Sequence, residues 1–265
     1  MKFMLDVQNQ EDGRGIKIRR TGVTRVHLPF LISDGGAVQR VSAEVRFTVS
    51  LNEKIRGTHM SRLIEILTDW VETPLKMSDV EKILEDAISK LETDFSAIRL
   101  AFKFFVKKIA PVSERISLLD VDCEFIGELS RGSRMNFSLI LVVPFTSLCP
   151  CSKEISDFGA HNQRSLCKVK LDFRDTDRLD EVSIEKIAGL VENLGSSKIY
   201  PILKREDEKF VTETAYQNPK FVEDILRDVV IKLRGVENIS GFEVECENFE
   251  SIHNHNAFAG HREIF

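Results

Sequence analysis

In the first half of the chain, the pattern of apolar and polar residues changes from the alternation of strands to the spacing of helices and then back to alternation. Strand-like segments, rich in β-branched and aromatic residues with partial alternation, occupy residues 23–32, 37–51, 98–109 and 116–129. Between them, residues 56–72 and 78–94 place apolar side chains at helical spacing. The first half is therefore predicted to have the order ββααββ.

The same order of elements follows a polar break at residues 131–133. Strands are predicted over residues 137–143, 166–173 and 239–249 and in the tail from residue 257, with helices over residues 183–194 and 219–233. A long connection without secondary structure is expected over residues 196–217. The repeat predicts an α+β chain with two tandem modules, residues 1–132 and 133–265.

Each module would be an antiparallel sheet with a helix pair on one face. About four strands leave open edges and an uncovered face, so we expect oligomerisation to complete the structure, for example as a barrel.

Capping signals predict where the helices begin and end. The expected caps are Thr58 or Ser61, a capping box formed by Ser78 and Glu81, a left-handed C-cap at Gly195, and a start at Asn218 and Pro219.

Reactive side chains are concentrated after the strand at residues 137–143. The segment contains Cys149, Cys151, Lys153, Glu154, Asp157, His161, Gln163 and Arg164. If the backbone is extended, Cys149 and Cys151 lie on one face, and a loop can bring His161 to the same metal ion. The alternative is a pair of buried thiols and a surface histidine. A metal site here would lack a third ligand, which we seek among Glu206, Asp207 and Glu208, although these also fit a solvated charged loop.

Other candidate groups lie near helix starts and at the C-terminus. Glu250 and His253 follow a strand, where a carboxylate can orient an imidazole for acid–base chemistry. His255 and His261 fit exposed polar positions. Glu223 is best explained by the N-terminal charge preference of a helix, and Arg56, His59 and Arg62 surround a helix start that can hold a phosphate or simply be solvated.

Composition limits the possible partners and location. The 265 residues carry a formal charge of −5, so no general basic field attracts nucleic acid. No apolar run approaches the roughly 20 residues that span a bilayer, and the N-terminus lacks the pattern of a signal peptide. We therefore expect a cytoplasmic protein without a nucleic-acid or membrane partner. Its five cysteines are expected to be free thiols or metal ligands.

Four segments resemble the GTP cyclohydrolases of type IB over nearly the whole chain. They are RGTHMSRL, VPFTSLCPCSKEISDFGAHNQRS, LKREDEKFVTETAYQNPKFVED and ESIHNHNAFA. The resemblance implies two tunnelling-fold modules and a homotetramer with active sites at subunit interfaces. It also implies conversion of GTP to 7,8-dihydroneopterin triphosphate and formate.

By motif position, the resemblance implies that Cys149, His161 and Glu208 bind a divalent metal, with zinc, manganese and iron all compatible. It assigns the guanine edge to Glu223, in place of the purely helical role above. Cys149, Glu250 and His253 would be catalytic, with His253 as proton donor and acceptor. Candidate triphosphate contacts are Lys153, Arg164, Lys204, Arg205, His59 and Arg62.

The chain departs from the family pattern at Phe158, Phe258, Gln217 and Asn256, outside the proposed catalytic set. Two rival functions remain: a nitrile reductase of the same fold with a cysteine nucleophile, and a pterin or purine binding module with a structural zinc. In the reductase, loss of Cys149 would leave metal content unchanged.

Overall fold

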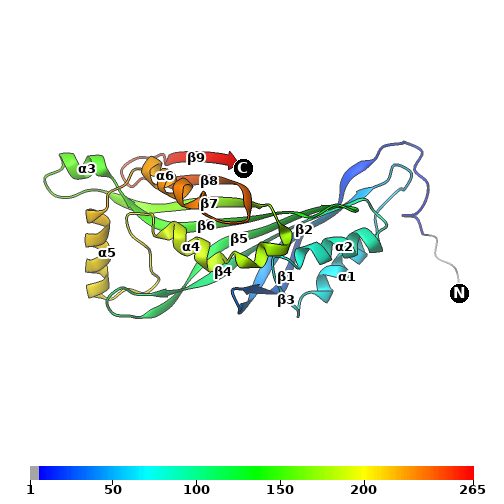
Figure 1. Cartoon of the computed structure of the whole chain (residues 1–265), viewed down its shortest axis with the longest axis horizontal. Coiled ribbons are helices and arrows are strands. Elements are labelled where there is room, and N and C mark those ends of the chain that lie inside the picture. Colours follow the sequence, from blue (N-terminus) through cyan, green and yellow to red (C-terminus); the bar gives the residue numbers. More distant parts are fainter. Residues whose placement is uncertain (1–5) are drawn as a thin grey trace. The chain divides into compact units, whose positions relative to one another are not determined.

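The computed structural model describes residues 6–265 and contains one nine-stranded sheet with helices, so the predicted α+β class is confirmed (Figure 1). Its strand order is β3-β1-β2-β4-β5-β6-β7-β8-β9. The strands are β1 (Ile18–Asp34), β2 (Ala37–Leu51), β3 (Pro74–Leu75), β4 (Phe95–Ile109), β5 (Ile116–Ser130), β6 (Asn136–Leu148), β7 (Asn162–Phe173), β8 (Ile239–Asn248) and β9 (Ala257–Ile264). The helices are α1 (Met60–Asp69), α2 (Val80–Lys90), α3 (Pro150–Ile155), the 3₁₀ helix η1 (Thr176–Glu181), α4 (Ile184–Glu192), α5 (Arg205–Gln217) and α6 (Val222–Leu233).

The chain forms two compact units. One contains the residues up to Phe102 together with Glu124–Ser138 and Thr176–Asp180, and the other contains Lys103–Cys123, Leu139–Asp175 and Glu181–Phe265. The long strands β4, β5 and β6 contribute residues to both units. A division into modules at residue 132 remains a prediction.

In the first unit, β1 and β2 form a hairpin that ends with Asp34 paired to Ala37. Gly35 and Gly36 connect them with φ values of 55° and 89°. A two-residue turn with positive φ at both positions matches the right-handed twist of the flanking strands, and glycine adopts it without a Cβ clash. This turn sets the register of the hairpin.

The predicted caps of α1 and α2 were wrong. The N-cap of α1 is His59, and its side chain makes no capping hydrogen bond. Ser78 and Glu81 form no capping box, because each binds a distant partner instead. The hydroxyl of Ser78 donates to Asp180 at 2.7 Å, and Glu81 accepts the backbone N–H of Met135 at 3.1 Å. Tertiary contacts replace the local ones.

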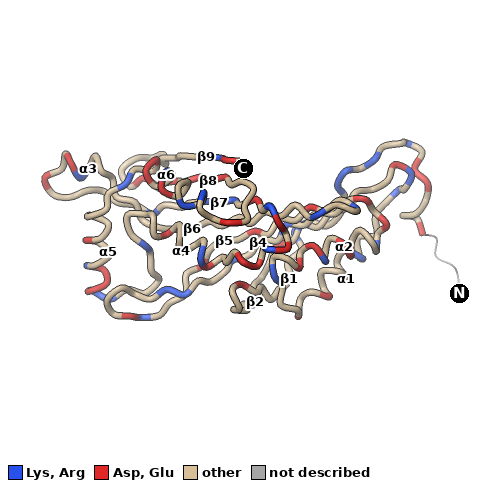
Figure 2. Tube along the Cα trace, viewed as in Figure 1, with Lys and Arg blue, Asp and Glu red and all other residues tan. Residues whose placement is uncertain are grey.

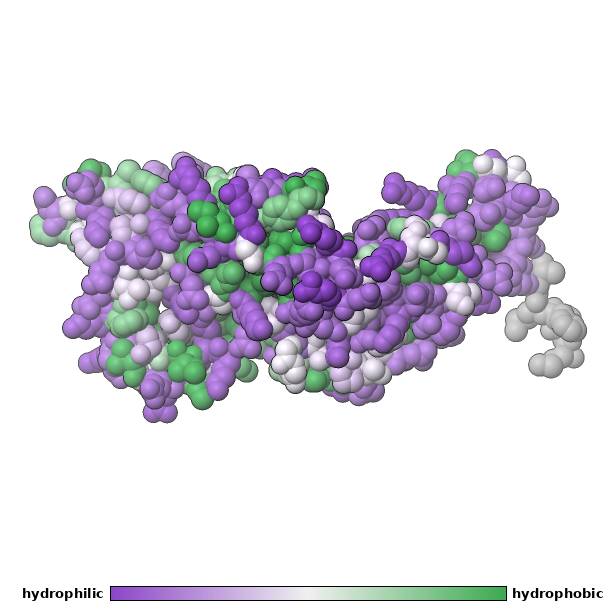
Figure 3. Space-filling view, viewed as in Figure 1, coloured by the Kyte–Doolittle hydropathy of each residue, from purple (hydrophilic) through white to green (hydrophobic). Residues whose placement is uncertain are grey.

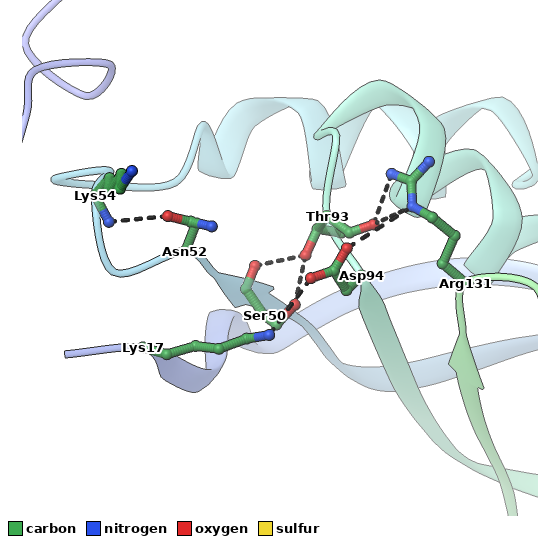
Figure 4. Close-up of polar contacts among 7 residues, drawn as sticks. All are labelled: Lys17, Ser50, Asn52, Lys54, Thr93, Asp94 and Arg131. Carbon is green, nitrogen blue, oxygen red and sulfur yellow. Dashed lines mark hydrogen bonds and ion pairs between the residues drawn. The ribbon is translucent and has the colours of Figure 1, made fainter. Parts of the chain in front are cut away.

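A polar cluster joins strand ends in this unit (Figure 4). The Thr93 hydroxyl lies 2.7 Å from that of Ser50, and both residues are buried. Arg131 donates to the Thr93 carbonyl, and Lys17 pairs with Asp94 at 3.4 Å. The cluster links the ends of β2 and β5 with the start of β4.

In the second unit, β7 pairs antiparallel with β8, and β8 with β9. Buried residues alternate along both β7 and β8, with Cys167 opposite Cys246 and Val169 opposite Val244. Helix α6 packs on β8 and β9. This half therefore has the expected strands, but among the described residues its second unit contains four α-helices, α3 to α6, where a pair was predicted.

One of the two additional helices is α5, where a connection without secondary structure was expected. Asp207 explains part of the difference, because it accepts the backbone N–H of Lys204, the N-cap residue of α5, at 2.8 Å.

The predicted start of α6 and the predicted C-cap at Gly195 were also wrong. Helix α6 begins at Val222 rather than Pro219, since Asp224 caps the backbone N–H of Phe221 at 3.1 Å.

Gly195 is not a left-handed C-cap, because α4 already ends at its C-cap residue Asn193 and the φ of Gly195 is not positive. A Cβ at Gly195 would lie 2.6 Å from Cδ2 of the buried Phe145, so glycine is required there for a close approach to β6.

Charged residues of both signs are interspersed along the chain (Figure 2). On the face drawn in Figure 3, hydrophilic residues predominate and hydrophobic ones form small separate groups. Within residues 6–265, no helix combines the length and the apolar character that a membrane span requires.

Candidate functional site

Cys149 lies at the junction between β6 and α3 in the second unit. The expected extended Cys149–Pro150–Cys151 segment is wrong, because Pro150 is the first residue of α3 and Cys149 is its N-cap. Proline suits this position, since its fixed φ matches a helix and its missing N–H is not needed. As a result the thiol of Cys149 is half-buried at the helix start, and that of Cys151 is exposed.

Ser152 connects Cys149 to His161. Its backbone N–H donates to Sγ of Cys149 at 3.4 Å, and its hydroxyl donates to the Cys149 carbonyl at 3.1 Å. The same hydroxyl accepts the backbone N–H of His161 at 3.2 Å. The backbone N–H of Cys149 donates to the His161 carbonyl at 3.1 Å. These bonds close the loop between the two predicted metal ligands.

The imidazole of His161 is held by Gln163. Nδ1 of His161 lies 3.0 Å from Oε1 of Gln163, and Nε2 of Gln163 donates to the hydroxyl of Ser147 at 2.7 Å. Ser165 donates to the same hydroxyl at 2.9 Å. Ser147 and Ser165 are fully buried. A buried polar group therefore lies directly behind the imidazole.

Glu250 approaches the same ring nitrogen. Its Oε2 lies 3.8 Å from Nδ1 of His161, and the side chains of the two residues are 12% and 14% exposed. The predicted partner of Glu250 was His253. In the structure, the exposed His253 stacks on His255 with ring centroids 5.0 Å apart. Glu250 is thus placed to orient His161, and its link to His253 remains a prediction.

Helix α5 carries the predicted third ligand, Glu208, in its first turn, where it is exposed. Its neighbour Asp207 is fully buried and accepts the backbone N–H groups of Val112 and Ser113 at 2.8 and 2.9 Å. Burial would raise the pKa of Asp207, but hydrogen bonds from Ser113, Lys204 and Val112 outweigh it and hold that pKa below its usual range. Asp207 fastens the start of α5 to the β4–β5 turn.

The opposite end of α5 is the end nearest α3. Lys153 donates to the carbonyl of Tyr216 at 2.6 Å, and its ammonium lies 4.4 Å from the ring centroid of Tyr216. Eight residues of helix separate Glu208 from Tyr216, or about 12 Å along the axis. Within residues 6–265, no three His, Cys, Asp or Glu side chains lie close enough to hold a metal ion. The structure brings His161 and Glu250 together but leaves Glu208 apart from them.

The other predicted substrate contacts of this unit are exposed. Glu223 lies in the first turn of α6 with its side chain in solvent. Arg164 is on β7, Lys204 is the N-cap of α5, and Arg205 is the first residue of that helix. All three cations are exposed and so are accessible to a large anionic ligand.

His59 and Arg62 belong to the first unit and line a pocket of about 230 Å³ at the start of α1. Arg62 donates to the Lys90 carbonyl at 3.0 Å, and Nε2 of His59 lies 3.5 Å from a carboxylate oxygen of Asp6. The hydroxyl of Thr58, which also lines the pocket, is buried and has no hydrogen-bond partner among residues 6–265. Such a hydroxyl beside a helix N-terminus can donate to an anion.

Sequence reasoning found the Cys149–His161 segment but missed the roles of Ser147, Ser152 and Ser165. A signal was present for two of them, because Ser147 and Ser165 lie at inward positions of β6 and β7, in phase with the buried apolar residues of each strand. Polar residues at inward positions indicate a buried hydrogen-bond network. Ser152 gave no such signal, since its contacts depend on the turn of α3.

Comparison with known proteins identifies the family. A family model described as type I GTP cyclohydrolase folE2 matches residues 4–259. The chain is 45% identical over 255 residues to GTP cyclohydrolase FolE2 of Azoarcus sp. strain BH72, covering 96% of this chain and 93% of that protein. It is 46% identical over 257 residues to the FolE2 protein of Geotalea uraniireducens, covering 97% and 92%.

The chain belongs to the type I GTP cyclohydrolase FolE2 family. The predicted family resemblance is thus confirmed.

Solved structures show the fold of this FolE2-family chain. Urate oxidase from Bacillus subtilis aligns with a TM-score of 0.54 at 8% identity, covering 92% of this chain and 98% of that one. Uricase from Arthrobacter globiformis gives a TM-score of 0.51 at 9% identity, covering 93% of both chains. At this identity the likeness concerns the fold alone, and it confirms the predicted tunnelling fold.

The donor set of this FolE2-family site suits a divalent metal. Cys149 offers a half-buried sulfur, and His161 offers an imidazole whose Nδ1 is already engaged by Gln163 and faces Glu250. Ligating histidines commonly make such a bond through the nitrogen that does not bind the metal. Two donors and the groups behind them therefore fit a metal ligand role.

Proposed function

We propose that this protein is a metal-dependent GTP cyclohydrolase that converts GTP and one net water to 7,8-dihydroneopterin triphosphate and formate. The observation that carries the proposal is the contact of Gln163 and Glu250 with Nδ1 of His161, beside Cys149. Membership of the FolE2 family supports the choice of GTP as substrate.

Cys149 and His161 would hold the metal, with Glu208 as the third ligand. The bound cation would make water nucleophilic near neutral pH. Glu208 lies in the first turn of α5, so a change at this end of α5 or a shift of the Cys149 loop would be needed to complete the set. Thiolate, imidazole and carboxylate together are compatible with zinc, manganese or iron.

The remaining groups would bind and protonate the substrate. The carboxylate of Glu223 can accept two hydrogen bonds from the N–H and NH₂ edge of guanine. His253 is exposed and can donate a proton to N7, which makes C8 more electrophilic, and it can later accept one. These steps require no cysteine nucleophile.

The triphosphate would be bound by cations and by a helix start. Arg164, Lys204 and Arg205 are exposed for this purpose, whereas Lys153 would first have to leave the carbonyl of Tyr216. His59 and Arg62 line an anion-compatible pocket in the other unit.

We further propose a cytoplasmic homotetramer. Its assembly would cover the outer strand β9, where Phe258 and Ile264 are 63% and 74% exposed. Exposed apolar side chains on β4 and β5 are a second surface of this kind: Phe105, Ile109, Ile116 and Leu118. Light scattering after size exclusion gives the subunit number directly.

The deciding experiment uses the full-length protein after removal of metal with a chelator. Mn²⁺ or Zn²⁺ is restored, GTP is added, and both formate and oxidised neopterin fluorescence are measured. We expect both products only with metal present. GTP binding without either product under any metal would support the function of a binding module. NADPH-dependent reduction of a deazaguanine nitrile would instead indicate a nitrile reductase.

Cys149→Ala separates these functions further. It should lose metal and both products together, since the proposal makes its sulfur a ligand. A variant that keeps its metal content but loses activity would support a nucleophilic cysteine instead.

A further inference from the structure

Gln163 occupies a position between the imidazole of His161 and the buried core of the second unit. Its own side chain is buried, with the residue 8% exposed. Because side chains of an extended segment alternate, residues 161, 163 and 165 project to the same side. This places Gln163 beside His161 at one end and near Ser147 and Ser165 at the other.

The direction of the Gln163 amide follows from its neighbours. With Oε1 toward His161, the amide accepts a hydrogen from Nδ1–H and donates its own N–H to Ser147. Glu250 provides a second acceptor 3.8 Å from the same nitrogen. With the amide reversed, Nδ1 would carry a lone pair facing the carboxylate of Glu250, and two acceptors would oppose each other. The first arrangement is therefore the favourable one.

The position of the hydrogen on Nδ1 determines the state of Nε2, the other ring nitrogen of His161. A neutral imidazole with its hydrogen on Nδ1 has its lone pair on Nε2, and that lone pair is what a metal ion binds. Fixing the tautomer and the ring orientation before the metal arrives lowers the cost of binding it.

We propose that Gln163 is a positioning residue that, anchored by Ser147, holds His161 in the Nδ1–H tautomer with Nε2 free to bind a divalent cation. This inference rests on the proposed function only in taking His161 as a ligand. It adds a residue that touches neither the metal nor the substrate.

Metal affinity of the full-length protein tests the role. Apo-protein is titrated with Mn²⁺ and Zn²⁺ in competition with a chromophoric chelator. Gln163→Leu should weaken the affinity for both metals about 10- to 100-fold, because the acceptor for Nδ1–H of His161 is lost. Gln163→Glu keeps an acceptor and should restore affinity to within several-fold of wild type. Gln217→Leu, an exposed glutamine at the end of α5, is the matched control and should leave affinity unchanged.

Ser147→Ala tests the anchor. It should weaken metal binding less than Gln163→Leu does, and the double variant should bind no more weakly than Gln163→Leu alone, since Ser147 acts through Gln163. Circular dichroism and urea unfolding show whether each variant is folded. A purely structural role would lower the urea midpoint and leave metal affinity at the wild-type value, which would overturn the proposal.

The wild-type protein offers a readout without any substitution. Ring ¹⁵N chemical shifts of His161 should show a protonated Nδ1 and an unprotonated Nε2 in the apo-protein. The opposite tautomer, or a wild-type protein that binds neither metal, would refute the inference.

The two proposals can fail separately. Wild-type protein that binds metal but releases no formate contradicts the cyclohydrolase function. The metal affinities of the Gln163 variants then still test the role of Gln163. Wild-type protein that releases formate while Gln163→Leu binds metal normally contradicts only the role of Gln163.

Discussion

Oε2 of Glu250 lies 3.8 Å from Nδ1 of His161, although 89 positions separate the two residues in the sequence. Pairing of β7 with β8 produces this proximity, since Ser165 is opposite Asn248 and the Phe249 N–H donates to the Arg164 carbonyl at 3.0 Å. The ladder brings the start of β7 next to the end of β8. Both side chains are shielded from solvent, so the carboxylate has a stronger influence on the imidazole than it would in water.

Glu250→Gln should lower metal affinity by about tenfold, because the neutral amide loses the charge that favours Nδ1–H on His161. Turnover should fall with it. The affinity titration with Mn²⁺ and the formate assay measure both effects. Glu245→Gln is the control, since Glu245 pairs with Lys168 on the surface of β8 and should not alter either value. Unchanged metal affinity in Glu250→Gln would contradict the expected influence of Glu250 on His161.

His253→Ala should reduce the rate of formate release by about 10²- to 10⁴-fold, the usual contribution of a general acid–base group. Metal content should stay at the wild-type level, because the exposed His253 imidazole stacks on His255 and is not one of the proposed metal ligands. His255→Ala removes the stacked neighbour and is expected to change the rate much less. Equal losses in both variants would indicate that the stacked pair acts only as a structural unit.

Sequence pattern predicts elements whose signal is local. The strand at residues 37–51 matches β2 because alternating residues and a glycine turn define it. Cys149 and His161 were identified together for a similar reason, since both belong to one short segment. The class of fold follows from these local patterns taken in order.

Elements that depend on distant contacts were missed. Helix α5 has few apolar residues on a common face, and its start is fixed by Asp207 binding to Val112 and Ser113, some 95 positions away. The contact of Glu250 with His161 likewise requires the β7–β8 register. Neither relation leaves a periodic trace in the sequence.

Lys108→Met should lower the free energy of unfolding by about 3 kcal/mol, because it removes the main partner of the largely buried Glu192. The side chains of Lys108 and Glu192 are 5% and 12% exposed and form an ion pair. Burial lowers the pKa of Lys108, and the hydrogen bond to Glu192 opposes that effect. Lys198 lies 3.6 Å from Glu192 and partly compensates its charge. The expected loss of stability is therefore at the low end of the range for removing one partner of a buried ion pair.

Urea unfolding at one fixed protein concentration measures this loss, since oligomerisation would otherwise shift the midpoint. Lys198→Met is the control and should cost less than about 1 kcal/mol, because Lys198 is more exposed. Lys108→Met combined with Glu192→Leu should recover much of the stability. Equal losses for the two lysine variants would contradict the assignment of Lys108 as the main partner.

The ion pair between Arg234 and Glu263 should make stability depend on pH in the acidic range. Hydrogen bonds from Arg234 and then His261 lower the pKa of Glu263 from 4.5 to about 2. A carboxyl group with a depressed folded-state pKa stabilises the protein above its unfolded pKa, and this contribution disappears as pH falls through the folded pKa. The urea midpoint of the wild type should therefore exceed that of Arg234→Ala at pH 6, and the difference should narrow from about pH 4.5 downward. A difference that stays constant between pH 6 and pH 3 would show that Arg234 acts through packing on β9 rather than through the charge of Glu263.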